Sequence, residues 1–479
     1  MTATACLVMM LSAQGDGSTV AVGTCKQLLV DDYVIAERTN VTRELGAVVK
    51  ANGGKPVFTE GQFYGTVLFH EGRFKLWFRE FDNEHYGYAE SPDGIHFAIK
   101  GEVTGIPFAG DINLAVSLDP HETDPAHRFK AGFDAVGMAA GLAHSADGIH
   151  WTPYHDGQPV TCRAADTINQ IVWDPLAQAY RLSTRTDFGA GGGPLASTVA
   201  PDFEVRGTRM MLNPDVKADP AKWELVRHWH FDREGPKEYL RRQIYALPVW
   251  IYEDVYFGLM SVYDYPADIS EGTSTDQVSR HERNVMNYYL ATSRDGDDWD
   301  LEWVYAGRPF VPRGPDGAFD NDMIMPGSTI VTHNDTHWVY YGGANERHST
   351  VETDPPVRYE SVRAIGLATL PMDRFVALAA GDEPGVVVTR PFVVQGNSLE
   401  LNVDAHDGDL RCEVLDANGT PLEGYAGDAG FRRADVDELR LAVRWRDGID
   451  LKQLQGKRVR LRFRLRNAKL YAFRVTPPR

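Results

Sequence analysis

An eight-residue pattern occurs in two separate places in this chain. ESPDGIHF runs from Glu90 to Phe97, and HSADGIHW runs from His144 to Trp151. Such self-similarity indicates a repeated structural unit. Because Asp-Gly favours a tight turn between antiparallel strands, the pattern predicts a β-hairpin in each copy of the unit.

The repeat continues along the chain, with looser versions at residues 195–205, 290–299 and 366–376. Each version is preceded by a strand-like segment with an aromatic residue near its start, such as GRFKLWFRE or QAYRLSTR. Another strand-like segment ending in a polar turn, such as YGTVLFHEG, lies before that one. The unit is therefore predicted to hold four antiparallel strands, and five units between Tyr64 and Leu378 predict an all-β, five-bladed β-propeller.

Two alternatives fit the same repeats. One is a large β-sandwich in which the similarity is accidental. The other is a propeller with a sixth blade hidden in the long insert from Met210 to Arg241. The 45 glycines and 27 prolines suit many short strands joined by turns in either case.

The texture of the sequence changes after Leu378. The chain has 479 residues, which exceeds the size of one hydrophobic core and favours two domains. Residues 379–479 alternate strictly between apolar and polar side chains, which predicts a C-terminal β-sandwich. In its last basic strand, five arginines from Arg458 to Arg466 alternate with apolar residues. This stripe is interpreted either as a solvated face or as a surface that docks on the acidic propeller or an acidic sugar.

The N-terminal region is predicted to hold two short segments. Residues 1–25 form a tail or a degraded export signal, because the apolar stretch lacks preceding basic residues. A working signal would make the protein secreted or periplasmic, and otherwise we expect it to be cytoplasmic. Residues 26–378 are assigned to the propeller, whose N-terminal strand KQLLVDDYVIA is expected to close or cap it.

The overall charge and the cysteines exclude several functions. The net charge of −18 disfavours nucleic acid and anionic membranes as partners. No apolar run is long enough to span a bilayer. The four scattered cysteines show no zinc spacing and are interpreted as buried thiols, so no metal and no cofactor are predicted.

Acidic residues recur where the first strand of each unit begins. In a propeller these strand ends surround one central funnel, and neighbouring carboxylates there shift one another's pKa values and can act as acid and base. Any single Asp at such a point also suits a turn. The predicted funnel carboxylates are Asp111, Asp166, Glu238, Asp320 and Asp322.

Other polar and aromatic side chains flank these acids. The arginines are expected to hold hydroxyls or a carboxylate, or to form salt bridges between blades. The amides follow the acids of their units, and the tyrosines suit stacking on a sugar ring. These residues are Arg79, Arg185, Arg242, Asn113, Asn169, Tyr64, Tyr245 and Tyr263.

Several motifs, including LLVDDYVIA, AESPDGIHF, FDNDMI and YYGGANERH, resemble a group of bacterial proteins described as glycosyl hydrolase-like. The chain is also similar to the five-bladed propeller glycosidases of the invertase, levansucrase and arabinanase clan, and to mannoside phosphorylases. That resemblance implies a catalytic Asp in blade one, a supporting Asp in blade two and an acid Glu in blade three. Here blade two offers Asp111, blade three offers Asp166, and blade one has only Glu60.

The sequence therefore predicts a glycoside hydrolase acting on a carbohydrate substrate. Asp166 or Glu238 is the expected acid, and Asp111 or Asp320 the expected base, with an inverting route favoured by a wide funnel. The absent blade-one Asp keeps a non-catalytic carbohydrate-binding propeller open. A phosphorylase or a polysaccharide lyase on the same scaffold is the third alternative.

Overall fold

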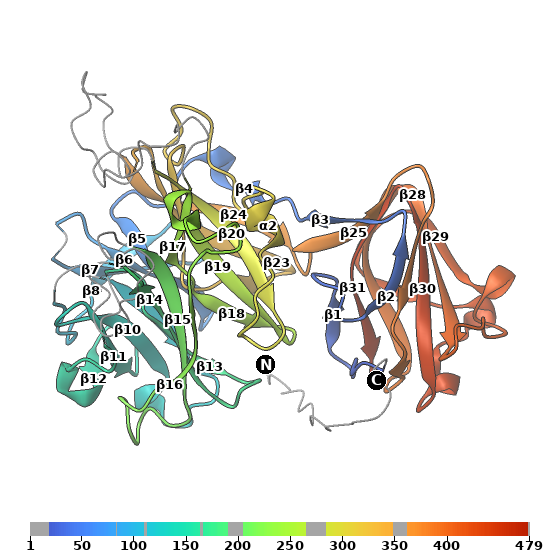
Figure 1. The fold of residues 1–479 in the computed structure, drawn as a ribbon, viewed down its shortest axis with the longest axis horizontal. Coiled ribbons are helices and arrows are strands. Elements are labelled where there is room, and N and C mark those ends of the chain that lie inside the picture. Colours follow the sequence, from blue (N-terminus) through green and yellow to red (C-terminus); the bar gives the residue numbers. More distant parts are fainter. Residues whose placement is uncertain are drawn as a thin grey trace. The chain divides into compact units, whose positions relative to one another are not determined.

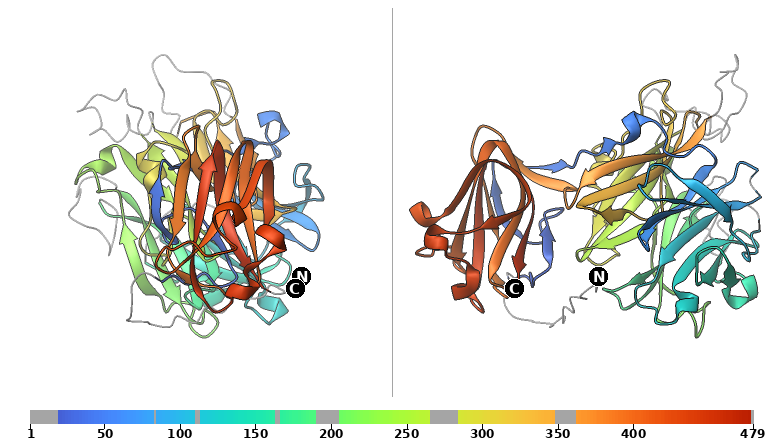
Figure 2. Two further views of the ribbon diagram at one scale, coloured as in Figure 1. Left: turned by 90° about the vertical axis from the view of Figure 1, so that its right-hand side faces the viewer. Right: turned by 180° about the vertical axis from the view of Figure 1, so that it is seen from behind.

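The protein is almost entirely β-structure (Figures 1 and 2). The computed structural model describes residues 19–82, 84–109, 113–162, 166–189, 205–264, 284–347 and 362–477. Contacts divide the chain into two compact units, one formed by Val48–Thr369 and the other by the segments before and after it. No helix in the described ranges is both long and apolar enough to cross a membrane.

The larger unit begins with three four-stranded antiparallel sheets, which match the first three predicted units. The first sheet contains β5 (Gln62–His70), β6 (Arg73–Arg79), β7 (Tyr86–Ser91) and β8 (Ala98–Glu102). The second contains β9 (Leu114–Leu118), β10 (Phe129–Ala135), β11 (Ala139–Ser145) and β12 (Trp151–Pro153). The third contains β13 (Gln170–Asp174), β14 (Ala179–Asp187), β15 (Arg206–Asn213) and β16 (Glu224–Trp229).

A nine-stranded sheet holds the fourth and fifth predicted units, and we interpret it as two blades joined by one parallel pair, Met286 with Met323. Pro248 interrupts the first strand of the fourth unit, because proline has no N–H for the ladder. The strands are β17 (Arg242–Ala246), β18 (Val249–Tyr252), β19 (Val255–Asp264), β20 (Val285–Ser293), β21 (Met323–Pro326), β22 (Val331–His333), β23 (Thr336–Ala344), β24 (Arg363–Pro371) and β4 (Val49–Lys50).

The units close into a ring. A buried apolar cluster lies between each successive pair of units, including the fifth and the first. Side chains and backbone of the innermost strands also meet: Thr66 bonds to Ser328 (Oγ1–Oγ, 2.5 Å) and accepts from the Val116 amide (2.9 Å), and Gln170 donates to the Val249 carbonyl (3.0 Å). These five residues come one from each predicted unit, which is the arrangement of a β-propeller and confirms the predicted all-β propeller fold.

The repeated turns connect neighbouring units of this ring. Each turn glycine has a positive φ, and its carbonyl accepts a hydrogen bond from a buried side chain of the preceding unit. A Cβ at these glycines would also collide with the donor side chain. The bonds are Tyr340 Oη to Gly94 (2.7 Å), Trp77 Nε1 to Gly148 (2.6 Å) and Arg181 Nη1 to Gly296 (3.2 Å).

The smaller unit is one ten-stranded sheet around a single apolar core. Its long strand β28 pairs with β31 through residue 404 and with β30 from residue 409 onward, and we interpret the two parts as the layers of the predicted sandwich. The strands are β1 (Lys26–Leu28), β2 (Ile35–Thr39), β3 (Thr42–Leu45), β25 (Val376–Ala380), β26 (Gly385–Thr389), β27 (Phe392–Val393), β28 (Ser398–Asp416), β29 (Phe431–Val443), β30 (Arg458–Arg466) and β31 (Ala468–Thr476).

The arginine stripe of β30 pairs with acids on the neighbouring strand β28. Arg462 and Arg464 both reach Glu413 (2.7 and 3.4 Å), and Arg466 reaches Asp409 (3.0 Å). The alternate residues, such as Leu461 and Phe463, are fully buried. Both halves of the predicted alternation are thus found, and each of these three cations has an acidic partner within its own sheet.

Three expectations differ from the structure. Residues 26–47 do not close the propeller, because β1, β2 and β3 pair with β31, β26 and β25 of the smaller unit. The insert after Met210 supplies β15 and β16 to the third sheet, so the described part of it forms no sixth blade. Cys162 is exposed, whereas Cys25 and Cys412 are buried as expected.

Candidate active site

The predicted site residues lie where first strands begin and second strands end. The antiparallel register places these two ends side by side in each sheet, as Gln62 opposite Arg79 and Arg242 opposite Asp264 show. One predicted member, Asp111, lies outside the described residues. The other acids fall into three separate environments.

Asp166 combines exposure with two arginines. Its side chain is 34% exposed, and it forms an ion pair with Arg185 of β14, whose side chain is buried. Burial by itself raises the pKa of Asp166, but the charges of Arg185 and Arg206 outweigh this effect and hold the pKa below its ordinary value. Asp166 is therefore an ionised carboxylate that a ligand can reach.

Arg185 lies next to a chain of three tyrosines that contact one another. The hydroxyls of Tyr64 and Tyr245 are 3.0 Å apart, and the Tyr245 ring packs on Tyr263 with centroids 5.0 Å apart. The Arg185 guanidinium lies 5.3 Å from the Tyr245 ring centroid. Burial raises the pKa values of Tyr245 and Tyr263, which keeps both hydroxyls protonated as hydrogen-bond donors.

Two further arginines complete the group. Arg79 lies 5.7 Å from the Tyr64 ring centroid, and Arg206 lies 5.4 Å from that of Tyr263. We call the whole group the Asp166 cluster; it contains Tyr64, Arg79, Asp166, Arg185, Arg206, Tyr245 and Tyr263.

The two predicted amides face a different partner. Asn113 and Asn169 donate to the two carboxylate oxygens of Asp134 on β10, over 3.0 and 2.6 Å. All three side chains are buried. Asn113 and Asn169 therefore join the second and third sheets through Asp134. These contacts favour a structural role for the two amides over sugar binding.

Glu238 and Arg242 form a second environment before β17. Glu238 is buried, accepts from the Glu234 amide (2.7 Å) and from the Tyr305 hydroxyl (3.4 Å), and lies 3.7 Å from Arg242 Nε. Tyr305 comes from the short helix α2 (Glu302–Tyr305), and the Arg242 guanidinium stacks over its ring. These contacts fix the chain that enters β17.

Asp320 and Asp322 differ sharply although they are two residues apart. Asp320 is buried and bound by Lys50 Nζ (2.5 Å) and by the Tyr341 hydroxyl (2.9 Å), which favours a structural role. Asp322 is 17% exposed and 3.6 Å from Arg347. Burial raises the pKa of Asp322 above its ordinary value, against the opposing charge of Arg347. Its neighbour Met323 packs in the same apolar cluster as Tyr245 and Tyr263.

Sequence reasoning missed two charged residues at these strand ends. Arg206 begins β15 opposite Asp187, and Asp264 ends β19 opposite Arg242. Asp264 accepts from Asn287 and Tyr289 (both 2.7 Å), and burial raises its pKa. Arg79 and Arg185 were predicted because they lie near the end of the second strand of a unit. The same criterion would have identified Asp264.

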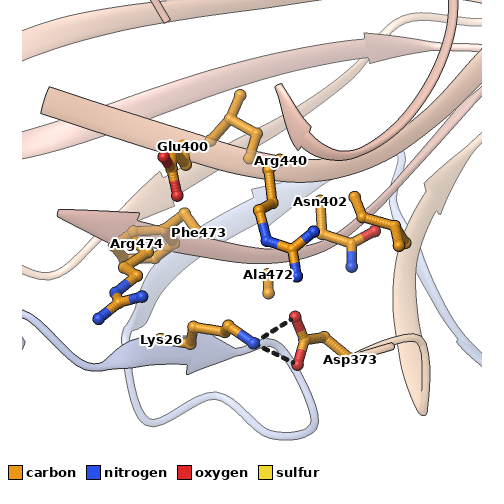
Figure 3. A pocket seen from close by; sticks show the side chains of 10 residues that line it. Lys26, Asp373, Glu400, Asn402, Arg440, Ala472, Phe473 and Arg474 are labelled. Carbon is orange, nitrogen blue, oxygen red and sulfur yellow. Dashed lines mark hydrogen bonds and ion pairs between the residues drawn. The ribbon is translucent and has the colours of Figure 1, made fainter. Parts of the chain in front are cut away.

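Two cavities belong to the smaller unit. One has a volume of about 30 Å³, is crossed by the Lys26–Asp373 ion pair (2.9 Å) and has room for little more than water (Figure 3). The other has a volume of about 450 Å³. Charged residues that line it are paired with one another, such as Glu44 with Lys469 (2.9 Å) and Asp404 with His406 (2.8 Å).

One group in the described part of the chain has donor atoms close enough for a metal ion. The donor atoms of Glu80, Asp82 and His85 lie within 4.8 Å of one another. However, Asp82 accepts from the His85 ring (2.6 Å) and from the Glu84 amide (2.8 Å), as Asp93 does with His96 in the repeated turn. The arrangement is that of a capped turn.

Comparison with known proteins gives structural matches only. No protein-family model matches the chain, and no curated protein matches it. Among solved structures, a thermostable family-43 glycoside hydrolase is 14% identical with a TM-score of 0.45, covering 68% of this chain and 94% of that one.

Two more matches span a larger share of the chain. The exo-inulinase from Aspergillus awamori is 12% identical with a TM-score of 0.39, over 88% of this chain and 99% of that one. The β-fructofuranosidase from Schwanniomyces occidentalis is 9% identical with a TM-score of 0.37, over 95% and 98%. These are members of the groups that the sequence resembles, and at such identities the similarity concerns the fold alone.

Proposed function

We propose that this chain is a glycoside hydrolase in which the Asp166 cluster holds the sugar. One observation carries the proposal: a half-buried, ionised carboxylate is paired with a guanidinium group that lies over a tyrosine ring. A sugar ring can stack on the half-buried ring of Tyr64, and the half-buried guanidinium of Arg79 can bond to its hydroxyls. A carboxylate in such a site is the group that glycoside cleavage needs.

The two carboxylates with opposed pKa shifts take the two roles. Asp166, whose pKa is lowered, activates water or attacks the sugar. Asp322, whose pKa is raised, protonates the leaving oxygen. This reverses the expected role of Asp166 as the acid, because an acid must hold its proton near the working pH.

The positioning groups are Arg79, Arg185 and Tyr245. Arg185 keeps Asp166 ionised and lies over the buried ring of Tyr245, so it fixes the position of the carboxylate. Arg79 lies over Tyr64, a half-buried ring of the cluster. Asp111 stays a candidate base from the sequence.

The test is release of reducing ends from a panel of plant, algal and microbial glycans. We expect the wild type to release them, and Asp166→Asn and Asp322→Asn to lower kcat about 100-fold or more. Asp156→Asn is the matched control, since Asp156 is a turn residue with positive φ that asparagine tolerates. Unchanged release by both active-site variants rules the assignment out.

A non-catalytic carbohydrate-binding propeller is the second candidate. The ion pair between Asp166 and Arg185 favours it, because a carboxylate held by a guanidinium is a weaker base than a free one. This function is identified if the wild type binds a glycan but releases no reducing ends from it, and if Asp166→Asn loses the binding.

A further inference from the structure

The hairpin between β6 and β7 exposes an aromatic ring two residues after Arg79 of the Asp166 cluster. Phe81 is 51% exposed, and among the described Phe, Tyr and Trp side chains it is the one that is more than about a third exposed. We propose that Phe81 is the stacking platform of an outer subsite that binds a neutral sugar residue of an extended glycan. This inference rests on the proposed function, because the Asp166 cluster binds the inner part of the same glycan.

The position of Phe81 connects it to the cluster. β6 ends at Arg79, whose guanidinium lies over the Tyr64 ring, and Phe81 follows two residues later. Two residues of extended chain span at most about 7 Å. A chain of sugars leaving the Tyr64 side of the cluster can therefore reach Phe81.

The burial of the other rings shows what is unusual about Phe81. The neighbouring strand residues Trp77 and Phe78 are buried between the sheets, as the alternating packing requires. Exposed apolar surface costs about 25 cal/mol per Å², so a ring in water is stabilised when a ligand covers it. The apolar face of a sugar ring is such a cover.

The surroundings of Phe81 supply hydrogen-bond acceptors and negative charge. Glu80 and Asp82 flank it in the chain, and His85 bonds to Asp82. Carboxylate oxygens accept from sugar hydroxyls, whereas they repel a sugar carboxylate. The subsite therefore binds a neutral sugar in preference to an acidic one. In this charge preference it differs from the arginine-rich inner site.

The experiment measures dissociation constants by calorimetry with neutral oligosaccharides (arabino-, xylo-, fructo- and manno-oligosaccharides) and with the corresponding monosaccharides. For the oligosaccharide that binds, we expect Phe81→Ala to raise Kd roughly three- to tenfold, the loss of one aromatic contact. Phe81→Tyr is expected to restore wild-type binding. Monosaccharide binding stays unchanged in both variants.

Ile99→Ala is the matched control, because Ile99 is equally exposed (52%) but lies on the outer strand β8. It is expected to bind like the wild type. An unchanged Kd in Phe81→Ala, an equal loss for monosaccharides, or no binding by any oligosaccharide overturns the subsite.

The two proposals fail in different ways. In the hydrolase proposal, the Asp166→Asn variant allows oligosaccharide binding to be measured without cleavage of the ligand. If the wild type cleaves no glycan but Phe81→Ala still weakens oligosaccharide binding, the subsite stands and the hydrolase proposal falls. If the wild type cleaves glycans and Phe81→Ala has wild-type KM on them, the subsite falls alone.

Discussion

Asp166 and Asp322 carry the same side chain, yet their surroundings move their pKa values in opposite directions. The guanidinium groups beside Asp166 outweigh its burial and lower the pKa, whereas burial dominates at Asp322 and raises it. In the proposed function, this separation assigns Asp166 as the base or nucleophile and Asp322 as the acid.

The pH dependence of kcat/KM tests this separation. Activity needs Asp166 ionised, so it falls as the pH drops through a pKa below the ordinary Asp value. It also needs Asp322 protonated, so it falls as the pH rises through a pKa above that value. We expect a bell-shaped profile with its maximum on the acid side of neutrality. The residual activity of Asp322→Asn should lack the alkaline limb, and an unchanged limb contradicts the assignment.

Six residues of the cluster were predictable because the repeat fixes which strand end each one occupies. The structure brings together residues that lie at such ends: Tyr64, Arg79, Asp166, Arg185, Tyr245 and Tyr263. Their partners were not predictable. Asp166 and Asp320 both lie before a first strand, yet Asp166 is half-buried and Asp320 is buried against Lys50. Lys50 belongs to β4, which is far from Asp320 in the chain, so the repeat does not predict this contact.

At the scale of elements, the repeated turn explains why the sequence repeats. Ser, Asp and Gly of each copy bond within the turn, as Ser91 does to Asp93 and to the Gly94 amide (both 2.9 Å). The turn then presents its glycine carbonyl to the preceding unit. The hairpin was predicted from Asp-Gly alone, but the donors are a Tyr, a Trp and an Arg, which share no pattern in the sequence.

Removing one of these donors should loosen the ring. Tyr340→Phe deletes the hydroxyl that bonds to Gly94 and leaves a buried carbonyl unpaired, so we expect a loss of about 1–3 kcal/mol in the free energy of unfolding. Urea denaturation followed by fluorescence measures it. Tyr288→Phe is the control: Tyr288 is equally buried, and its hydroxyl bonds to no described residue. Equal stability of the two variants would argue against the role of the bond.

At the scale of the whole molecule, the smaller unit is formed by segments from both ends of the chain, which the alternation of apolar and polar residues does not reveal. Residues 26–47 belong to the same unit as the C-terminal strands, and β4 then completes the last sheet of the propeller. Alternation predicts strands but not their partners, so the predicted boundaries at residues 25 and 378 fell in the wrong places. Pairing of β25 with β3 and β31 sets the second boundary earlier.

Fragments of the chain should report this organisation. Residues 48–369 are expected to unfold cooperatively on their own, because every sheet of that unit is complete. Residues 379–479 lack β1, β2 and β3, and with them buried residues such as Leu29, Val34 and Ile35. Each contributes about 1.5–3 kcal/mol, which together approaches the 5–15 kcal/mol of a typical domain.

We therefore expect the 379–479 fragment to lack a cooperative urea transition by circular dichroism. A single chain that joins residues 19–47 to residues 370–479 should regain it. Cooperative unfolding of 379–479 alone, with the stability of the joined chain, would show that the N-terminal strands are dispensable.

The central claim is that the Asp166 cluster is where this protein holds a glycan. A crystal structure of the Asp166→Asn variant with the oligosaccharide that binds most tightly tests it most directly. We expect a sugar ring against Tyr64, within hydrogen-bonding distance of Arg79 and of residue 166. A glycan bound elsewhere, with that cluster unoccupied at saturating concentration, would contradict it.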